Sequence, residues 1–270
     1  MKIVVCIKQV PDTTDIKWTE NNTLQREGVE SIINPFDEYA LETALRIKDK
    51  YGATVTAISM GPPQAEEMLR KAIALGCDSA FLVSDKKFSG ADTVATSRTL
   101  ASAIKAKIPD YDLIICGQFA TDGDTAQTGP SIAEKLDIPQ VTYVKEITLL
   151  EDKFLTVKKE IEEGVQTLRV QIPGLICMQK CDYELRQAHI LGYIKAQLAN
   201  VPTYNSVDLN IEPSEVGIKG SPTYVSKAFR PEQKQRGEII EPQSVSEAVS
   251  FIVDKIESYK AEYSSLASKE

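Results

Sequence analysis

The sequence predicts an α/β fold: a doubly wound, mostly parallel sheet, an antiparallel β extension, and a C-terminal arm that ends in a helix. Strand-like and helix-like segments alternate through the first half of the chain, which is typical of a parallel sheet covered by helices on both faces. After Pro139, apolar and polar residues alternate, which indicates antiparallel strands. Five prolines are then distributed along the stretch from Val201 to Pro242, which indicates an extended segment.

The first half of the chain contains short apolar runs separated by segments with an apolar stripe at helical spacing. Asn34 is the expected N-cap of the first helix, with Pro35 in its first turn and Gly52 at its end. We expect strands over 2–8, 53–60, 79–84 and 111–116, and helices over 35–52, around Met68 to Leu75, over 91–107, and after Pro130.

The second half predicts a β extension that continues the same sheet. The expected antiparallel strands are 140–150, 153–161 and 166–178, with turns at 152–153 and 162–164.

The C-terminal region reads as an arm that either stays mobile or wraps a partner. Ser244 to Glu247 matches the capping box S-x-x-E, which opens a helix. The apolar face of that helix must be buried on its own domain or on a partner chain, and we favour the partner. We therefore expect two domains, 1–200 and 201–270. The apolar face consists of Val245, Val249, Ile252, Val253 and Ile256.

Composition and charge exclude several classes of function. The net charge of −8 argues against nucleic-acid binding, because phosphate backbones require a basic surface. No apolar run approaches the length of a membrane span, and Met1-Lys2 leads directly into a strand. The five cysteines have no framework spacing, which indicates a reducing compartment, and we expect a cytoplasmic protein.

The chain is poor in side chains that perform catalysis by themselves. It has one histidine, His189, and it lacks the CxxC, GxSxG and HExxH motifs. Cys177 and Cys181 lie four positions apart without further ligands nearby, so we expect no metal site. Any chemistry is therefore expected to belong to a bound cofactor.

The stretch CGQFATDGDTAQTGP, Cys116 to Pro130, joins a predicted buried strand to a predicted helix. A turn in this position presents backbone N–H groups at a helix N-terminus, where they can hold a phosphate. Gly117, Gly123 and Gly129 are expected to supply the backbone freedom that such a turn needs. The loops after Met60 and Cys116 share the carboxyl edge of the predicted sheet, which favours a nucleotide site there.

The same loop contains no Lys or Arg, so a phosphate would be held by amides and by the hydroxyls of Thr121, Thr125 and Thr128. Asp122 and Asp124 would repel a bare phosphate, so we assign them to ribose hydroxyls or to helix capping. An acidic, well-capped turn without a ligand accounts for the same residues. Neither GxxxxGK(S/T) nor GxGxxG is present.

Several segments together resemble the beta subunit of electron transfer flavoprotein over essentially the whole chain. VCIKQVPDT and NPFDEYALETALRIK are similar to that family's opening strand and first helix, and SMGPPQAEEMLRKAIALGCD resembles its second strand–helix unit. VKKEIEEGVQTLRVQIPGLIC, residues 157–177, matches the long family signature, with Gln166 and Pro173 in place. A pattern of this length is far more specific than one glycine loop.

The resemblance implies an adenine-nucleotide-binding α/β domain that pairs with a larger alpha subunit, which carries an electron-shuttling FAD. It also implies a second nucleotide in this chain: structural AMP in respiratory members, or a second FAD in electron-bifurcating members. The C-terminal arm and helix are expected to pack on the alpha subunit. The residues that match the family's nucleotide pocket are Cys6, Asn34, Pro35, Phe36, Asp37, Met60, Ala120, Thr121, Asp122, Gly123, Asp124, Thr125, Ala126, Gln127, Thr128, Gly129, Pro130 and Ser131.

The resemblance implies that Cys6 lies where the family's first strand passes the adenine. It also implies that residues 34–37 match the segment that contacts the base and ribose, and that residues 120–131 match the loop that holds the phosphates. AMP-type members carry DDDCNQTG where this chain has DGDTAQTGP. Because glycine lets the backbone approach a ligand closely, Gly123 favours the longer diphosphate of FAD over AMP.

The resemblance to the bifurcating group implies a specific electron path. NADH would reduce the FAD held here, one electron would pass to ferredoxin or flavodoxin, and the other would reach a partner flavin-dependent dehydrogenase through the alpha-subunit FAD. A non-bifurcating subunit with structural AMP is the alternative. A distant alternative, an ATP-using α/β enzyme, usually has glycines after its first strand, and KQVPDTTD has none.

The loop that docks the dehydrogenase carries LRLNEPRY in respiratory members, whereas the equivalent stretch here is KCDYELRQ, residues 180–187. Glu184 and Arg186 match that pattern, and Tyr183 and Leu185 are candidate anchors for the partner. Alternatively, Tyr183 and Leu185 only pack this loop onto the sheet.

Overall fold

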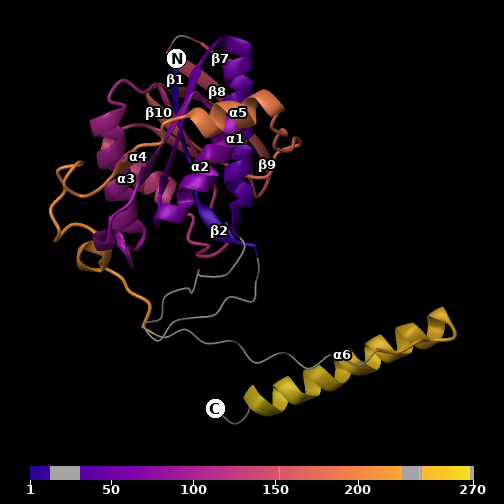
Figure 1. Cartoon of the computed structure of the whole chain (residues 1–270). Coiled ribbons are helices and arrows are strands. Elements are labelled where there is room, and N and C mark those ends of the chain that lie inside the picture. Colours follow the sequence, from indigo (N-terminus) through magenta and orange to yellow (C-terminus); the bar gives the residue numbers. More distant parts are fainter. Residues whose placement is uncertain (13–30, 152, 227–236, 238, 268–270) are drawn as a thin grey trace. The chain divides into compact units, whose positions relative to one another are not determined.

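The computed structural model describes residues 1–12, 31–151, 153–226, 237 and 239–267, and in this part of the chain nine strands form one sheet (Figure 1). The order is β11-β5-β4-β1-β6-β10-β7-β8-β9. Neighbours from β11 to β7 are parallel, and β8 pairs antiparallel with both β7 and β9. The predicted fold class is therefore confirmed. The strands are β1 (Lys2–Cys6), β4 (Thr54–Met60), β5 (Ser79–Val83), β6 (Leu113–Gly117), β7 (Gln140–Leu150), β8 (Phe154–Ile161), β9 (Gly164–Gln171), β10 (Gly174–Met178) and β11 (Thr203–Tyr204).

Helices cover both faces of this sheet. Because successive residues of a strand point to opposite faces, each strand contributes side chains to two cores. Ile3 and Val5 face one core with α1, α2 and α5, whereas Val4 faces a second core with α3 and α4. β2 (Gln9–Pro11) and β3 (Ser31–Ile33) form a small antiparallel sheet that the sequence did not predict. The helices are α1 (Pro35–Tyr51), α2 (Glu66–Leu75), α3 (Thr93–Lys107), α4 (Thr128–Leu136) and α5 (Ile190–Leu198), with short 3₁₀ turns at Pro63–Ala65, Lys86–Phe88 and Gly217–Gly220.

The order of the strands places a topological switch point between β1 and β6. From β1 the chain proceeds to β4 and then β5 on one side, and it returns through α3 to form β6 on the other side of β1. Loops that follow β1 and β6 therefore diverge at the carboxyl edge of the sheet, where open α/β sheets bind ligands.

The strand predicted over 166–178 is wrong, since the structure has two strands there. β9 ends at Gln171, and β10 begins at Gly174 and inserts between β6 and β7, parallel to both. Pro173 has no N–H to donate to a ladder, so the strand stops before it. All five residues of β10 are buried, which is typical of a strand in a parallel sheet.

Two predicted helix starts differ from the structure. α3 begins at Thr93, since the side chain of Asp92 caps it by accepting from the N–H groups of Val94 and Ala95 at 2.9 and 3.0 Å. α4 begins at Thr128, so Pro130 lies in its first turn, where a missing N–H does no harm.

The first part of the predicted arm packs on its own domain, which corrects the expectation of a mobile or partner-wrapping segment. β11 adds an edge strand next to β5, and Leu209, Ile211 and Val216 are buried in the second core. These apolar residues are isolated in the sequence, so no periodic pattern revealed them. The chain forms two compact units, Met1–Ala228 and Phe229–Glu270, and the first extends past the boundary expected after residue 200.

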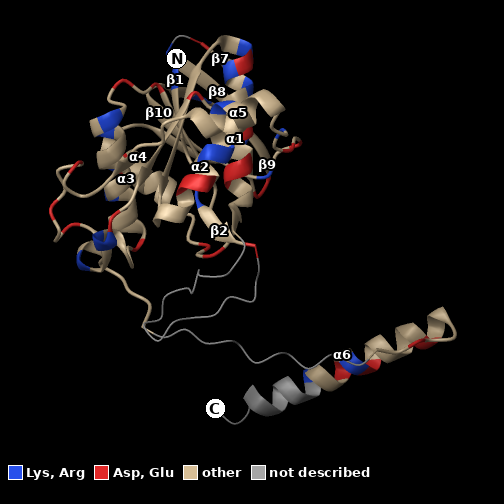
Figure 2. Cartoon of the chain, in the orientation of Figure 1, with Lys and Arg blue, Asp and Glu red and all other residues tan. Residues whose placement is uncertain are grey.

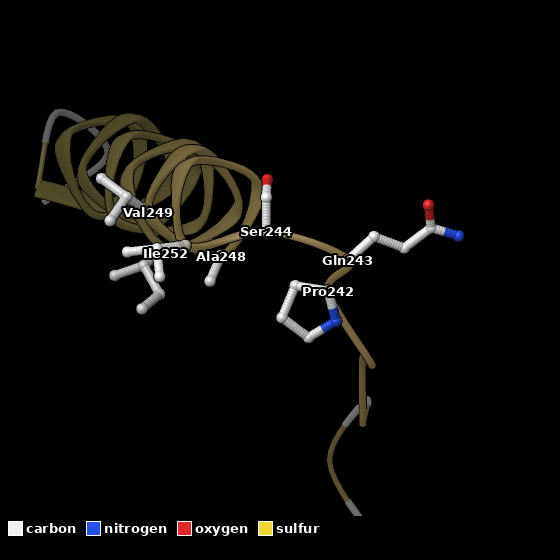
Figure 3. A pocket seen from close by; sticks show the side chains of 7 residues that line it. Pro242, Gln243, Ser244, Ala248, Val249 and Ile252 are labelled. Atoms are coloured by element: carbon white, nitrogen blue, oxygen red, sulfur yellow. The ribbon is translucent and has the colours of Figure 1, made fainter.

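The second unit contains α6 (Val245–Ala267), which begins where the capping box predicts. The Glu247 N–H donates to Ser244 Oγ at 3.2 Å, and the Glu247 carboxylate accepts from the Gln243 N–H at 2.9 Å. An open hollow lies at this end of the helix, lined by Pro242, Gln243, Ser244, Val245, Ala248, Val249 and Ile252 (Figure 3).

Candidate functional site

The N-terminus of α1 and the loop after β6 meet at the switch point. The Asn34 side chain joins them: its nitrogen donates to the Phe119 carbonyl at 2.8 Å, and its oxygen accepts from the Thr121 N–H at 3.1 Å. Asn34 occupies the N-cap position of α1, as predicted, but its side chain makes no capping hydrogen bond to the helix. The interpretation of Asn34 as a plain cap is therefore wrong.

Asp37, in the first turn of α1, connects the ends of the two strands that flank the switch point. Its carboxylate accepts from the Lys8 N–H at 2.7 Å and from the Gly117 N–H at 3.1 Å. Burial raises the pKa of this carboxyl from 3.8 to about 7, although the hydrogen bonds from Lys8, Asn34 and Gly117 oppose the rise. Asp37 therefore titrates near neutral pH.

The loop contains no cation of its own, but Lys8 brings one from the segment after β1. Its ammonium lies 2.5 Å from a carboxylate oxygen of Asp122, whose side chain is only 3% exposed. Asp122 thus forms an ion pair in the structure, a role that the sequence did not assign to it. The rings of Phe36 and Phe119 pack with centroids 4.1 Å apart and add an apolar contact between α1 and the loop.

The expectation that three glycines supply positive φ in this loop is wrong. Asp124 and Ala126 have the positive φ angles, 48° and 54°. Gly117 is required by proximity instead, because a Cβ there would lie 2.2 Å from Asp37 Oδ1. Gly129 similarly faces the Cys177 sulfur, which would lie 2.4 Å from its Cβ. Among the residues that the structure describes, a Cβ on Gly123 would meet no atom within 4 Å.

The remaining predicted pocket residues form two groups. Thr121, Gly123, Asp124, Thr125 and Gln127 are exposed, and Ala120, Ala126, Thr128, Pro130 and Ser131 are partly buried. Gln127 and Ser131 also contact α3: Gln127 accepts from Thr93 Oγ1 at 2.9 Å, and the hydroxyls of Ser131 and Ser97 lie 2.7 Å apart. The loop therefore rests on α3 and exposes Thr121, Gly123, Asp124 and Thr125.

Pro35 is partly buried at the start of α1, and the strands beneath the loop contribute two further predicted residues. Met60 is partly buried at the end of β4 and packs against the second core. Cys6 lies beside Cys116, and Cys116 lies beside Cys177, across the parallel strands β1, β6 and β10. A hydrogen bond with Cys6, and then burial, raise the pKa of the Cys116 thiol, and burial raises the pKa of the Cys177 thiol, so these two thiols are protonated at neutral pH.

One residue near the site has a backbone conformation that the sequence did not predict. Tyr143 has a φ of 58°, a region that bulky side chains rarely adopt, and its N–H donates to the buried Gln118 side chain at 2.8 Å. Gln118 directly follows β6, so β7 is tied to the start of the loop. The local sequence around Tyr143 and Gln118 does not predict this hydrogen bond.

The candidate docking segment is held largely by α1. The Tyr183 hydroxyl lies 2.5 Å from Thr43 Oγ1, and the Arg46 guanidinium lies 4.1 Å from the centroid of the Tyr183 ring. Arg186 pairs with Glu42 at 2.9 Å. Leu185 is partly buried against the core, whereas Glu184 is exposed.

Exposed apolar side chains follow immediately, on α5, where sequence analysis did not place a site. α5 packs on α2 through its small residues, since a Cβ on Gly192 would lie 2.1 Å from the Ala74 carbonyl oxygen and Ala196 is buried. Its large apolar side chains therefore point outward, with exposed fractions of 51% to 83%: Ile190, Leu191, Tyr193, Ile194 and Leu198.

Acidic and basic side chains are interspersed over the α/β unit in the view of Figure 2. Within the described part of the chain, no helix has the length and apolar character needed to cross a membrane.

Fold and site together define an open α/β protein whose candidate ligand site lies at the switch point of a parallel sheet. Residues 21–206 match the electron transfer flavoprotein domain. The chain belongs to the electron transfer flavoprotein family, which confirms the resemblance found in the sequence.

Relatives of nearly full length support this assignment. An electron transfer flavoprotein subunit beta of Clostridium acetobutylicum is 46% identical over 95% of this chain and 98% of its own length. The caffeyl-CoA reductase-Etf complex subunit CarD of Acetobacterium woodii is 44% identical over 95% of this chain and 98% of its own length. The protein FixA of Azotobacter vinelandii is 44% identical over 92% of both chains.

Proposed function

We propose that the chain is the beta subunit of an electron-bifurcating electron transfer flavoprotein, and that it binds FAD at residues 120–131. The observation that supports this most is the position of that loop, which lies at the switch point beside the N-terminus of α1. Ligands of open α/β sheets bind at this place.

The chemistry of the loop suits an adenine dinucleotide. Backbone N–H groups of the loop and of the first turn of α4 suit phosphate oxygens, and Lys8 supplies a cation beside them. The open space at Gly123 and the exposure of Thr121 and Thr125 leave room for a diphosphate that continues outward. These features favour FAD over AMP.

FAD, when bound, would accept hydride from NADH and deliver electrons singly to two acceptors, ferredoxin or flavodoxin and a partner dehydrogenase. This chain's residues would bind and orient the nucleotide. The thiols of Cys116 and Cys177 beneath the loop are protonated, so they would present neutral groups to it. Cys6, Cys116 and Cys177 are all free thiols, which suits a reducing cytoplasm.

The partners are assigned to two exposed apolar surfaces. The alpha subunit, with its own FAD, would cover the apolar face of α6, whose members are 46% to 82% exposed in this chain. The partner dehydrogenase would dock on α5 and the adjoining loop that contains Glu184. The name of CarD places that relative in a complex with a caffeyl-CoA reductase.

The nucleotide content of the co-purified heterodimer tests this function. The complex is supplemented with FAD, desalted and denatured, and the released nucleotides are separated by chromatography. Two FAD and no AMP per heterodimer is the expected result. One FAD with one AMP would refute the bifurcating assignment and leave this chain a structural AMP-binding subunit. Supplementation controls for a weakly bound FAD that is lost during purification.

A further inference from the structure

We propose that Asn34 and Asp37 are positioning residues: their buried side chains hold the backbone of the loop over 117–124 in its binding shape. The proposal rests on the proposed function, because it concerns the site to which the nucleotide is assigned. The family resemblance implies that residues 34–37 contact the base and ribose, and the proposal adds a separate role for the side chains of Asn34 and Asp37 toward the loop.

The Asn34 side chain binds the loop backbone at two points. This side chain is fully buried, and it contacts both the Phe119 carbonyl and the Thr121 N–H. It also hydrogen-bonds to Asp37. An asparagine at an N-cap normally accepts from the helix's own N–H groups, and this one makes no such bond. Its hydrogen-bonding capacity is directed to the loop in place of the helix.

Asp37 fixes the point at which the loop leaves the sheet. The residue is 6% exposed, and both of its oxygens accept from backbone N–H groups, those of Lys8 and Gly117. Gly117 is the last residue of β6, and any Cβ there would collide with the carboxylate. Glycine therefore permits a contact that sets the direction of the chain entering the loop.

These contacts leave the outward face of the loop to the ligand. Asn34 and Asp37 are buried behind the loop backbone and use their polar atoms on it, whereas Thr121, Gly123 and Asp124 are exposed. A buried polar group that loses its partner is costly, so each of these bonds opposes rearrangement of the loop. The loop is thus shaped before a nucleotide arrives, which lowers the ordering cost of binding.

The test uses the heterodimer, stripped of nucleotide, and measures hydrogen–deuterium exchange in peptides that cover 117–124. Asn34→Ala removes both contacts with the loop, and Asp37→Asn replaces one accepting oxygen by a donor. Lys48→Ala is the matched control, because Lys48 lies at the other end of α1 and bonds to Gly76 and Asp78 at 2.8 and 2.6 Å. Affinities for FAD and for AMP are then measured on the same samples.

We expect the loop to exchange about five- to tenfold faster in Asn34→Ala and Asp37→Asn, before any nucleotide is added, and at the wild-type rate in Lys48→Ala. Nucleotide affinity should fall by a similar factor. Asn34→Asp keeps an oxygen for the Thr121 N–H but loses the donor to the Phe119 carbonyl, so it should restore only part of the protection, and it serves as the second variant if Asn34→Ala does not fold.

Wild-type exchange of the loop in Asn34→Ala and Asp37→Asn would overturn the proposal. If affinity nevertheless fell, the two residues would be direct ligands. A wild-type heterodimer that bound neither FAD nor AMP would refute the proposed function instead, and the exchange of the empty loop would still decide the role of Asn34 and Asp37.

Discussion

At the scale of single residues, the glycines near the loop differ in whether they tolerate an added Cβ, although the sequence analysis gave them the same role. Gly117→Ala would place a Cβ 2.2 Å from Asp37 Oδ1 and 2.7 Å from the Phe36 carbonyl carbon, so the backbone must shift. We expect a loss of about 2–3 kcal/mol in the free energy of unfolding. Gly123→Ala is the control, because no atom of the described part of the chain lies within 4 Å of its added Cβ, and we expect a change within about 0.5 kcal/mol.

Urea unfolding of both variants measures this difference. Equal losses in the two variants would contradict the prediction, because they would mean that the contact between Gly117 and Asp37 does not constrain the backbone.

Asp37 should make the stability of the chain depend on pH. Its pKa is 3.8 in a model peptide and about 7 in the fold, so the folded state binds a proton more tightly than the unfolded state. Such a group stabilises the fold fully below about pH 4, and this contribution is lost as the pH rises to about 7. The loss relative to Asp37→Asn should approach about 1.4 kcal/mol per pH unit between these limits.

The measurement is urea unfolding of wild type and Asp37→Asn at several pH values from 5 to 8. The difference between the two free energies should decline up to about pH 7 and then become constant. A difference that stays constant throughout this range would show that the carboxyl does not titrate there.

At the scale of elements, α5 and α6 each expose large apolar residues for different reasons. α5 uses Gly192 and Ala196 to approach α2 closely, which leaves its large side chains outside. The first turns of α6 contain one charged residue, Glu247, and its charged positions gather further along the helix (Figure 2). The two surfaces belong to different units of the chain, so each can be altered by substitution separately.

Charge introduced on α6 should block assembly with the alpha subunit. Val249 and Ile252 are 54% and 56% exposed in this chain and line the hollow of Figure 3. In Val249→Asp/Ile252→Asp, burial of two carboxylates would weaken the heterodimer by at least about a hundredfold in Kd. Ser250→Asp, on an exposed position of the same helix, should have little effect. Analytical ultracentrifugation distinguishes the heterodimer from free subunits.

Charge introduced on α5 should affect the partner dehydrogenase and not assembly with the alpha subunit. Leu191→Asp/Ile194→Asp is expected to leave the heterodimer intact and to weaken electron transfer to the partner dehydrogenase, mainly through a higher KM. Gln197→Asp, also exposed on α5, is the control. Loss of the heterodimer in the α5 variant would mean that the two surfaces have been assigned to the wrong partners.

At the scale of the whole molecule, sequence periodicity predicted β1, β4, β5, β6 and the helices α1 to α4, because apolar runs alternate there with amphipathic segments. It did not predict β2, β3, β11 or α5. The candidate loop was found for the same reason, since it lies between a recognisable strand and helix. The break at Pro173 was missed, because alternation of apolar residues continues across it and strand order depends on contacts distant in sequence.

Contacts within the site were less predictable than its location. Nothing in the local sequence of Asn34 shows that its side chain reaches the loop 85 positions away, or that Lys8 pairs with Asp122. The arm after residue 200 was misjudged for a related reason: its buried residues Leu209, Ile211 and Val216 are separated by polar ones and prolines. Long-range contacts of this kind carry no periodic signal.

The boundary between the two units gives a test of the whole fold. A chain ending at residue 228 keeps β11 and the buried residues that follow it, so its α/β unit should unfold with a midpoint in urea close to that of the full chain. A chain ending at residue 200 loses β11, Leu209, Ile211 and Val216, and exposes Phe81 and its neighbours in the second core.

Uncovering three buried aliphatic side chains costs about 1.5–3 kcal/mol each by area alone, which is a large part of the stability of an ordinary domain. The shorter chain is therefore expected to be unfolded or strongly destabilised, as measured by circular dichroism and urea unfolding. If both truncations were equally stable, the segment after residue 200 would not belong to the core of the first unit. If both were unfolded, the second unit would be needed for folding.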